Sequence, residues 1–256
     1  MKPIVKPGLS KTLYSIAMVA AIWYFVHAAI SPRTIPGPLT TVFALARLLS
    51  EGDLPIHIAV SILRISVALC ISIVIGVPLG LWMGLSKRTD AVITPVAYIL
   101  YPLPKIAFLP VFMILFGLGE GSKTVLVITV ILFPILLAAR DGVKEIPAQL
   151  FYSVRSLGLS RRQIYANLVI PAALPKIITA VRISIGISIS VLFFSENYAT
   201  VHGIGYFIMN SWAIVKYEEM FAGILVLSLI GLSIFKLVDL VERKACRWLF
   251  INNQAL

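Results

Sequence analysis

The polar side chains of this sequence that could take part in chemistry are few and widely spaced. The three histidines, His27, His57 and His202, are scattered, and the two cysteines, Cys70 and Cys246, fall in different apolar runs. Neither set has the spacing of metal ligands or of a catalytic cluster. We also find no phosphate-binding Gly-x-x-x-x-Gly-Lys-Ser/Thr motif. The sequence therefore predicts no catalytic residue, no metal site and no cofactor in this chain.

Three charged residues, Arg64, Lys105 and Glu196, lie within or at the edge of long apolar runs. A charged side chain near the bilayer centre costs roughly 2.5 to 3.5 kcal/mol on insertion scales, so each should face a water-filled cavity, an opposite charge or an interface. An anionic solute would suit Lys105, which otherwise pairs with an internal acid or snorkels to the membrane surface. Arg64 has the same alternatives and could reach lipid headgroups. Glu196 is a candidate partner for either cation.

Prolines surround Lys105 and interrupt the apolar run from Ala91 to Gly119. Pro102 and Pro104 stand closest to it, with another proline towards each end of the run. A straight helix cannot form there. In lipid, backbone groups that proline leaves unpaired need partners in protein or in a water-filled cavity, so this run predicts either part of a translocation path or a kinked helix.

After Glu196 the chain stays polar and contains glycine for a short stretch. Asn197 and His202 in this stretch could line an outer gate, although a lone histidine is more often a structural residue. Farther on, Lys236 and Asp239 are three residues apart and are expected to pair within one helix. The candidate residues of a translocation path are therefore Arg64, Pro102, Pro104, Lys105, Glu196, Asn197 and His202.

The rest of the chain must supply membrane-spanning helices that position these residues. Of its 256 residues, 59% are hydrophobic and only 13% are charged, with a mean hydropathy of +0.98. A soluble domain of that size could not bury so much apolar surface, and continuous apolar runs favour helices over an outer-membrane barrel. We attribute the net charge of +11 to lysine and arginine in cytoplasmic loops. The expected partner is therefore a lipid bilayer and not a nucleic acid.

We predict an all-α integral membrane protein with about six transmembrane helices, in one transmembrane domain that covers residues 1–256. Each span needs roughly 20 apolar residues, and such runs lie at 13–30, 58–85, 91–119, 124–139, 177–194 and 221–240. Lys2, Lys6 and Lys11 precede the first run without any acidic residue, which indicates that the N terminus is cytoplasmic. An even number of spans makes the C terminus cytoplasmic too. The broken third run leaves five or seven spans as alternatives.

A polar, helix-forming segment at 151–171 follows the fourth span and is therefore expected in the cytoplasm. Gly158 can take the left-handed conformation that ends a first helix. Ser160 and Gln163 have the spacing of a capping box, so a second helix should start directly after Ser160. Pro171 should end that second helix. The segment predicts a hook of two short helices.

The spacing of the hook resembles the EAA loop of binding-protein-dependent ABC importer permeases. That pattern is Glu-Ala-Ala, three residues, Gly, nine residues, then Ile-x-Leu-Pro. Gly158 matches the glycine, and Pro171, thirteen residues on, matches the proline. Tyr152-Ser153-Val154 replaces Glu-Ala-Ala, and Leu168-Val169-Ile170-Pro171 replaces the apolar ending. The shape-defining residues are kept, whereas the usual acid is absent.

The resemblance extends over most of residues 57–210 and is specific to the permeases of nitrate, sulfonate, taurine and bicarbonate importers. It rests on four further groups of residues in the order and spacing of that subfamily. These are Ser61-Ile62-Leu63-Arg64 with Gly76-Val77-Pro78-Leu79-Gly80, Pro102-Leu103-Pro104-Lys105 with Phe116-Gly117-Leu118-Gly119-Glu120, Arg155-Ser156-Leu157-Gly158 with Pro171-Ala172-Ala173-Leu174-Pro175, and Glu196 with Gly203-Ile204-Gly205-Tyr206.

The resemblance implies a type I ABC importer permease fold in a bacterial inner membrane. It implies a complex of two permease chains, expected to be a homodimer, with two cytoplasmic ATPase subunits and an external solute-binding protein. ATP and Mg would be used by the ATPase, so the permease itself would not be an enzyme. The cytoplasmic coupling loop would span about 140–176.

The hook is the expected contact with the ATPase, because two helices held at a fixed angle transmit motion better than a flexible loop. The alternative is an amphipathic loop on the inner leaflet, held there by Arg155, Arg161 and Arg162. The candidate ATPase-coupling residues are Tyr152, Ser153, Val154, Arg155, Leu157, Gly158, Ser160, Ile164, Tyr165 and Pro171.

We expect the chain to form the translocation path for a small anion or zwitterion such as nitrate, sulfonate, taurine or bicarbonate. An importer of the same class that carries a neutral or aromatic nutrient is one alternative. A stand-alone carrier driven by an ion gradient is another, and it would be expected to show inverted repeats, which the sequence does not reveal on inspection.

Overall fold

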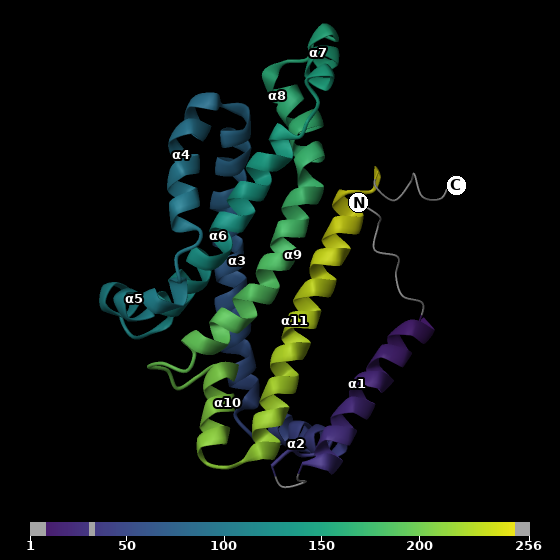
Figure 1. Cartoon of the computed structure of the whole chain (residues 1–256), viewed down its shortest axis with the longest axis vertical. Helices are drawn as coiled ribbons and strands as arrows, with labels where there is room; N and C mark the ends of the chain where they lie inside the picture. The colour runs from purple at the N-terminus through teal and green to yellow at the C-terminus, as the bar shows by residue number, and fades with distance from the viewer. Residues whose placement is uncertain (1–8, 31–33, 249–256) are drawn as a thin grey trace. The chain divides into compact units, whose positions relative to one another are not determined.

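The computed structural model describes residues 9–30 and 34–248, and within these ranges every regular element is a helix (Figure 1). Lys2 and Lys6, on which the predicted cytoplasmic N terminus partly rests, lie outside the described residues. The helices are α1 (Leu9–Ala29), α2 (Pro38–Glu51), α3 (Leu54–Leu85), α4 (Lys87–Leu100), η1 (Lys105–Phe108), α5 (Leu109–Phe116), α6 (Glu120–Lys144), α7 (Ala148–Ser156), α8 (Arg161–Ile164), the π-helical turn η2 (Tyr165–Val169), α9 (Ile170–Ser195), α10 (Ile204–Ala213) and α11 (Tyr217–Ala245).

Four helical stretches in the described residues are long and apolar enough to cross a membrane. They are α3, α6, α11 and the continuous stretch Arg161–Ser195. Helices α4 and α5 form a fifth candidate span, bent by 85° at its break. The described apolar part of α1, Leu13–Ala29, is shorter than these spans. The fold is therefore an all-α bundle with four or five clear spans, and the count of six and the orientation of the termini stay predictions.

The boundaries of two predicted spans differ from the helices of the structure. The residues between the predicted spans 58–85 and 91–119 form no long loop: only Ser86 separates α3 from α4, and it caps α4 by accepting a hydrogen bond from the Thr89 backbone N–H at 3.3 Å. The fourth predicted span, 124–139, is part of the longer helix α6. The sequence underestimated these helices because charged residues continue a helix beyond the apolar run.

The residues fall into two compact units, each made of segments that are distant in the sequence. One unit comprises the described residues within 1–62 and 196–230, and the other comprises those within 63–195 and 231–256. In the first unit, the Trp23 indole N–H donates to the Pro36 carbonyl at 3.1 Å, and its ring stacks on Phe221 with centroids 5.9 Å apart. These contacts connect α1, the turn before α2, and α11.

Helices α6 and α9 form the core of the second unit, where they pack along each other (Figure 1). Ile135 and Ala139 of α6 are buried together with Ala173 and Ile177 of α9. Gly142 marks the closest approach, since a Cβ atom there would lie 3.0 Å from Ala173. Small residues at such positions allow helix backbones to come close in a membrane bundle.

Three glycines at four-residue intervals bring α3 against α6 within the same unit. A Cβ atom on Gly80 would lie 2.3 Å from the Leu136 carbonyl oxygen, and one on Gly84 would lie 2.4 Å from the Val143 Cβ. Gly76, one turn earlier, also contacts α6. Because these distances are shorter than any van der Waals contact, only glycine permits this packing. The interface holds the start of the α4–α5 segment in place, because α4 follows α3 after one residue.

Candidate functional site

Gly158 ends α7 in the left-handed conformation that the sequence predicts. Its φ angle is +75°, and no atom lies within 4 Å of the position where a Cβ would be. The Gly158 N–H donates to the Arg155 carbonyl at 2.9 Å, and the Leu159 N–H donates to the Val154 carbonyl at 3.3 Å. These bonds satisfy carbonyl groups at the end of the helix. The glycine is therefore required by backbone geometry and not by lack of space.

The capping box after Gly158 is also confirmed. The Ser160 side chain accepts from the Gln163 N–H at 3.4 Å, and the Gln163 side chain accepts from the Ser160 N–H at 2.8 Å. Helix α8 begins at Arg161, as the motif predicts. The left-handed Gly158 and the capping box thus define the bend between α7 and α8. This bend lies at the ends of α6 and α9 that are expected in the cytoplasm (Figure 1).

The prediction that Pro171 ends the second helix is wrong. The chain continues from α8 through the π-helical turn η2 into α9, and the Ile170 N–H donates to the Tyr165 carbonyl five residues earlier. A π turn is wider than an α turn, so the ladder already departs from the i→i−4 pattern where the proline ring enters. Pro171 is therefore tolerated in the first turn of α9, and the hook continues directly into a membrane span.

The predicted coupling residues divide into an exposed and an anchoring set. Tyr152 and Leu157 are 68% and 77% exposed. Ser153, Arg155, Gly158 and Ser160 are exposed as well, and Val154 is half-buried. Ile164 and Tyr165 instead pack against the apolar core of the second unit. Helix α7 thus presents an exposed surface, while the following part of the hook packs against the helices of the second unit.

The prolines before Lys105 produce the predicted break between α4 and α5. Pro102 and Pro104 are exposed in this break, and Lys105 begins the short helix η1. The Lys105 amine donates to the Tyr101 carbonyl and lies 5.3 Å and 5.6 Å from the centroids of the Tyr101 and Phe133 rings. The amine thus satisfies a carbonyl left open by the break and is held by two aromatic faces.

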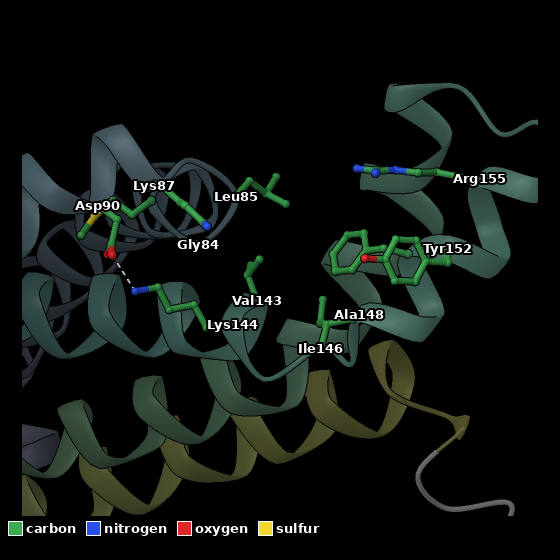
Figure 2. Close-up of a pocket in the computed structure, with 12 residues that line it drawn as sticks. Gly84, Leu85, Lys87, Asp90, Val143, Lys144, Ile146, Ala148, Tyr152 and Arg155 are labelled. Carbon is green, nitrogen blue, oxygen red and sulfur yellow. Dashed lines mark hydrogen bonds and ion pairs between the residues drawn. The ribbon is translucent and has the colours of Figure 1, made fainter.

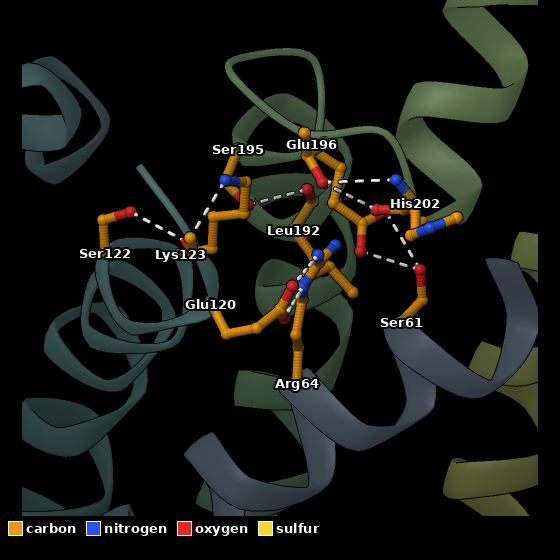
Figure 3. Close-up of polar contacts among 12 residues, drawn as sticks. Ser61, Arg64, Glu120, Ser122, Lys123, Leu192, Ser195, Glu196 and His202 are labelled. Atoms are coloured by element: carbon orange, nitrogen blue, oxygen red, sulfur yellow. Dashed lines mark hydrogen bonds and ion pairs between the residues drawn. The ribbon is translucent and has the colours of Figure 1, made fainter. Parts of the chain in front are cut away.

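Arg64 forms a bidentate ion pair with Glu120 (Figure 3). The Arg64 Nε and Nη2 atoms donate to the two carboxylate oxygens at 2.5 Å and 2.6 Å. The Arg64 side chain is 1% exposed, whereas that of Glu120 is 61% exposed. Arg64 is thus buried and does not extend to lipid headgroups, which corrects one of the alternatives for this residue. A charge-assisted pair of this geometry compensates for part of the desolvation of the guanidinium group.

Lys123 is a buried charge that the sequence analysis missed. Its side chain is fully buried, and its amine donates to the carbonyls of Leu118 and Gly119 at 2.9 Å and 3.3 Å. Both carbonyls belong to the turn that precedes α6, and Lys123 lies in the first turn of that helix. No local sequence pattern indicates this contact.

Glu196 is fully buried in the first unit and binds the beginning of α10 (Figure 3). Its carboxylate accepts from the Ser61 hydroxyl at 2.7 Å and from the Gly205 N–H at 2.8 Å. The Ser61 oxygen accepts from the Ile204 N–H at 2.8 Å, and the His57 Nδ1 accepts from the Gly203 N–H at 3.0 Å. The side chains of His57 and Ser61 in α3, and of Glu196 directly after α9, thus accept from N–H groups at the N terminus of α10, where negative charge is favourable.

Asn197 and His202, predicted to line an outer gate, both belong to the loop that follows Glu196. Asn197 is half-buried, and His202 is exposed, with its ring centroid 5.7 Å from that of His57. The assignment of these residues to a gate stays a prediction.

Asp239 pairs with another helix and not with Lys236 as the sequence predicted. Arg182 of α9 donates to Asp239 at 2.8 Å and to Glu242 at 2.5 Å, and both acids belong to α11. The sequence analysis missed Arg182 because its partners lie more than fifty positions away, beyond the reach of local spacing.

The family described as "Binding-protein-dependent transport system inner membrane component" matches residues 76–246. The putative aliphatic sulfonates transport permease protein SsuC of Bacillus subtilis (strain 168) is 31% identical over 94% of this chain and 88% of its own length. The taurine transport system permease protein TauC of Escherichia coli (strain K12) is 30% identical over 91% of this chain and 88% of its own length.

A third relative and a solved structure extend these similarities. The formylaminopyrimidine transport permease protein ThiX of Halalkalibacterium halodurans is 29% identical over 94% of this chain and 96% of its own length. A chain of the inward-facing MetNI methionine ABC transporter matches with a TM-score of 0.61 and 19% identity, over 74% of this chain and 94% of that chain. The structural match shows a type I ABC importer permease fold, and the apolar helices agree with a multi-pass protein of the bacterial inner membrane. The chain belongs to the family of binding-protein-dependent transport system inner membrane components and is a permease subunit of an ABC importer.

Proposed function

We propose that two copies of this chain form the translocation path of an importer for a small sulfonate or a similar anion or zwitterion. An external binding protein delivers the solute, and two cytoplasmic ATPase subunits drive the cycle with ATP and Mg. The observation that carries the solute class is the similarity to the SsuC and TauC permeases over at least nine-tenths of the chain. The permease itself carries no catalytic residue and no cofactor in this proposal.

The coupling role of the hook is supported by its construction. Helix α7 is exposed and lies between the membrane-spanning stretches α6 and Arg161–Ser195. Gly158 and the capping box hold it at a defined angle, and the half-buried Ile164 and Tyr165 connect it to the core. A movement of the ATPase bound to α7 is therefore transmitted to α9, because α7 and α9 move together as a rigid element. The exposed residues from Tyr152 to Leu157 are the contact surface for the ATPase.

The residues proposed for the path contribute in different ways. Lys105 is half-exposed at the break of a bent span, which supports a contact with an anionic solute. Pro102 and Pro104 create that break, whereas Arg64 and Glu196 are buried and bound to protein groups. We therefore propose that Lys105 faces the solute and that Arg64 and Glu196 hold the surrounding helices.

A second solute class is supported by one specific observation. ThiX, whose name assigns it to formylaminopyrimidine transport, is nearly as similar to this chain as TauC is. A neutral aromatic nutrient is therefore the second candidate. A stand-alone carrier is disfavoured, because the family depends on a binding protein that such a carrier does not need.

Uptake into proteoliposomes tests the proposed function. The chain would be reconstituted with an ATPase subunit and a solute-binding protein of the same organism, and uptake of radiolabelled taurine would be followed with and without ATP. We expect uptake that requires ATP and all three proteins and that an excess of an alkanesulfonate inhibits. In a parallel assay with radiolabelled formylaminopyrimidine, uptake of that compound without uptake of taurine would select the second solute class. Uptake that persists without ATP or the ATPase would contradict the proposed function.

A further inference from the structure

A cleft of about 550 Å³ opens beside α7 in the second unit (Figure 2). The end of α3 and the beginning of α4 form one wall, α7 forms the other, and the end of α6 lies between them. Val143, Ile146 and Phe151 give the cleft an apolar floor, and its polar lining includes Lys87, Lys144, Tyr152 and Arg155. It is therefore a mixed apolar and cationic recess.

Two of the cationic residues of the cleft are available to a ligand. Lys144 donates to Asp90 at 2.5 Å, and the Arg140 Nε donates to the other oxygen of the same carboxylate. In contrast, Lys87 and Arg155 make no side-chain hydrogen bond or ion pair with any described residue. Figure 2 shows them on opposite sides of the cleft with their charged ends toward the space between them. The one acid in the lining is already bound to two cations, so the recess is positively charged.

We infer that this cleft receives an acidic side chain of the ATPase subunit, which binds between Lys87 and Arg155. The inference deepens the proposed function, on which it rests, because α7 is the proposed coupling helix. From Pro147 to Lys176 the chain contains Arg155, Arg161, Arg162 and Lys176 but no aspartate or glutamate. A partner that docks on this segment must therefore supply the negative charge.

The position of Arg155 favours a protein partner over a lipid headgroup. Arg155 lies in α7, which belongs to neither of the flanking membrane-spanning stretches α6 and Arg161–Ser195. A phosphate at the membrane surface would meet Lys87 and Lys144 near the ends of their spans, without the contribution of Arg155. A group that binds between the two walls must reach both Lys87 and Arg155.

Docking between the two walls would connect the ATPase both to the hook and to the bent span formed by α4 and α5. Arg155 belongs to the hook, which continues into α9, and Lys87 begins α4, the first half of the bent span with Lys105. The ion pairs of Asp90 with Arg140 and Lys144 connect α4 to α6 at the floor of the cleft. An acidic residue between the walls would hold the hook against the broken span.

Charge reversal at each wall tests the inference. The full chain would be placed in nanodiscs of phosphatidylcholine, and the dissociation constant of the ATPase subunit with which it is reconstituted would be measured over a range of NaCl concentrations. We expect Lys87→Glu and Arg155→Glu each to weaken binding about tenfold and to flatten its salt dependence. Arg88→Glu is the matched control, because Arg88 is the exposed neighbour of Lys87 outside the cleft lining. It should change binding less than about twofold.

Additional variants and lipid conditions identify the acidic partner residue and distinguish failure of the inference from failure of the proposed function. An Asp→Lys or Glu→Lys exchange in the ATPase that restores binding to Arg155→Glu would identify the docking acid. Wild-type affinity in both cleft variants would overturn the inference, as would losses equal to that of Arg88→Glu. A loss seen only in nanodiscs with phosphatidylglycerol would assign the cleft to a lipid phosphate instead. If the wild-type chain does not bind the ATPase, the proposed function itself fails. Gel-filtration profiles equal to wild type would show that the variants fold.

Discussion

Glu196 shows at the residue scale how a charge in an apolar chain can have a structural function. The carboxylate is fully buried and binds the Ser61 hydroxyl and the Gly205 N–H, so it closes the loop that leads into α10. A buried anion at a helix N terminus is stabilised by the N–H groups that point at it. The same interactions explain why an acid at the edge of a span need not contact a solute.

We predict that Glu196→Ala lowers the stability of the protein more than Glu196→Gln does. Alanine leaves the Ser61 hydroxyl and the Gly205 N–H without their acceptor, at about 1–3 kcal/mol for a buried group. Glutamine keeps one acceptor oxygen and should lose less. Thermal unfolding in detergent, followed by the fluorescence of a thiol-reactive or tryptophan probe, would rank the variants. Unchanged unfolding temperatures together with lost uptake would instead assign Glu196 to the path.

At the element scale, the contact of α3 with α6 depends on the absence of side chains. A Cβ atom on Gly80 would lie 2.3 Å from the backbone oxygen of Leu136. A Cβ atom on Gly186 in α9 would have as its nearest neighbour the Phe235 ring, at 3.9 Å. The two glycines therefore offer a matched pair of sites for the same substitution.

We predict that Gly80→Ala destabilises the bundle by about 1–3 kcal/mol, because the helices must separate to accommodate the methyl group. Gly186→Ala should be neutral or stabilise the protein by about 0.4–1 kcal/mol, because its methyl group has room and the unfolded chain loses freedom. Thermal unfolding of both variants in the same detergent compares them. Equal effects of the two substitutions would mean that α3 and α6 are not packed as closely as the structure shows.

The elements also differ in how far the sequence could predict them. The bend of the hook depends on Gly158 and on a capping box of four residues, so its signals are local, and both were predicted correctly. The continuation past Pro171 was predicted wrongly, because a π turn has no equally clear local signature. The partners of Glu196 could not be predicted, because Ser61 lies 135 positions away in the chain. Lys123 was missed because the sequence does not show which carbonyls fold back onto it.

At the scale of the whole molecule, the proposed function requires that binding of the ATPase at the hook changes the membrane-spanning helices. The continuous stretch from Arg161 to Ser195 provides one mechanical connection, since α8, η2 and α9 follow one another without a break. Gly158 lies at the bend where α7 joins this stretch. If the hook couples the ATPase to the membrane-spanning helices, as we propose, it needs a fixed shape, because a flexible bend would not transmit motion from α7 to α9.

We predict that Gly158→Val uncouples ATP hydrolysis from uptake. A β-branched residue at φ +75° is strained by roughly 1–2 kcal/mol, so the bend should relax to another conformation. Open space around the Cβ position means that a clash cannot be the cause. Gly158→Asn is the matched control, because asparagine tolerates the left-handed region.

ATP-driven solute uptake by the reconstituted importer, compared for the wild-type chain, Gly158→Val and Gly158→Asn, tests the coupling role of the hook. ATP hydrolysis and the amount of membrane-inserted protein would be measured in the same vesicles. We expect Gly158→Val to keep insertion and hydrolysis but to lose most uptake, while Gly158→Asn retains most of it. Wild-type uptake per ATP hydrolysed in Gly158→Val would contradict the assignment of this hook as the coupling element.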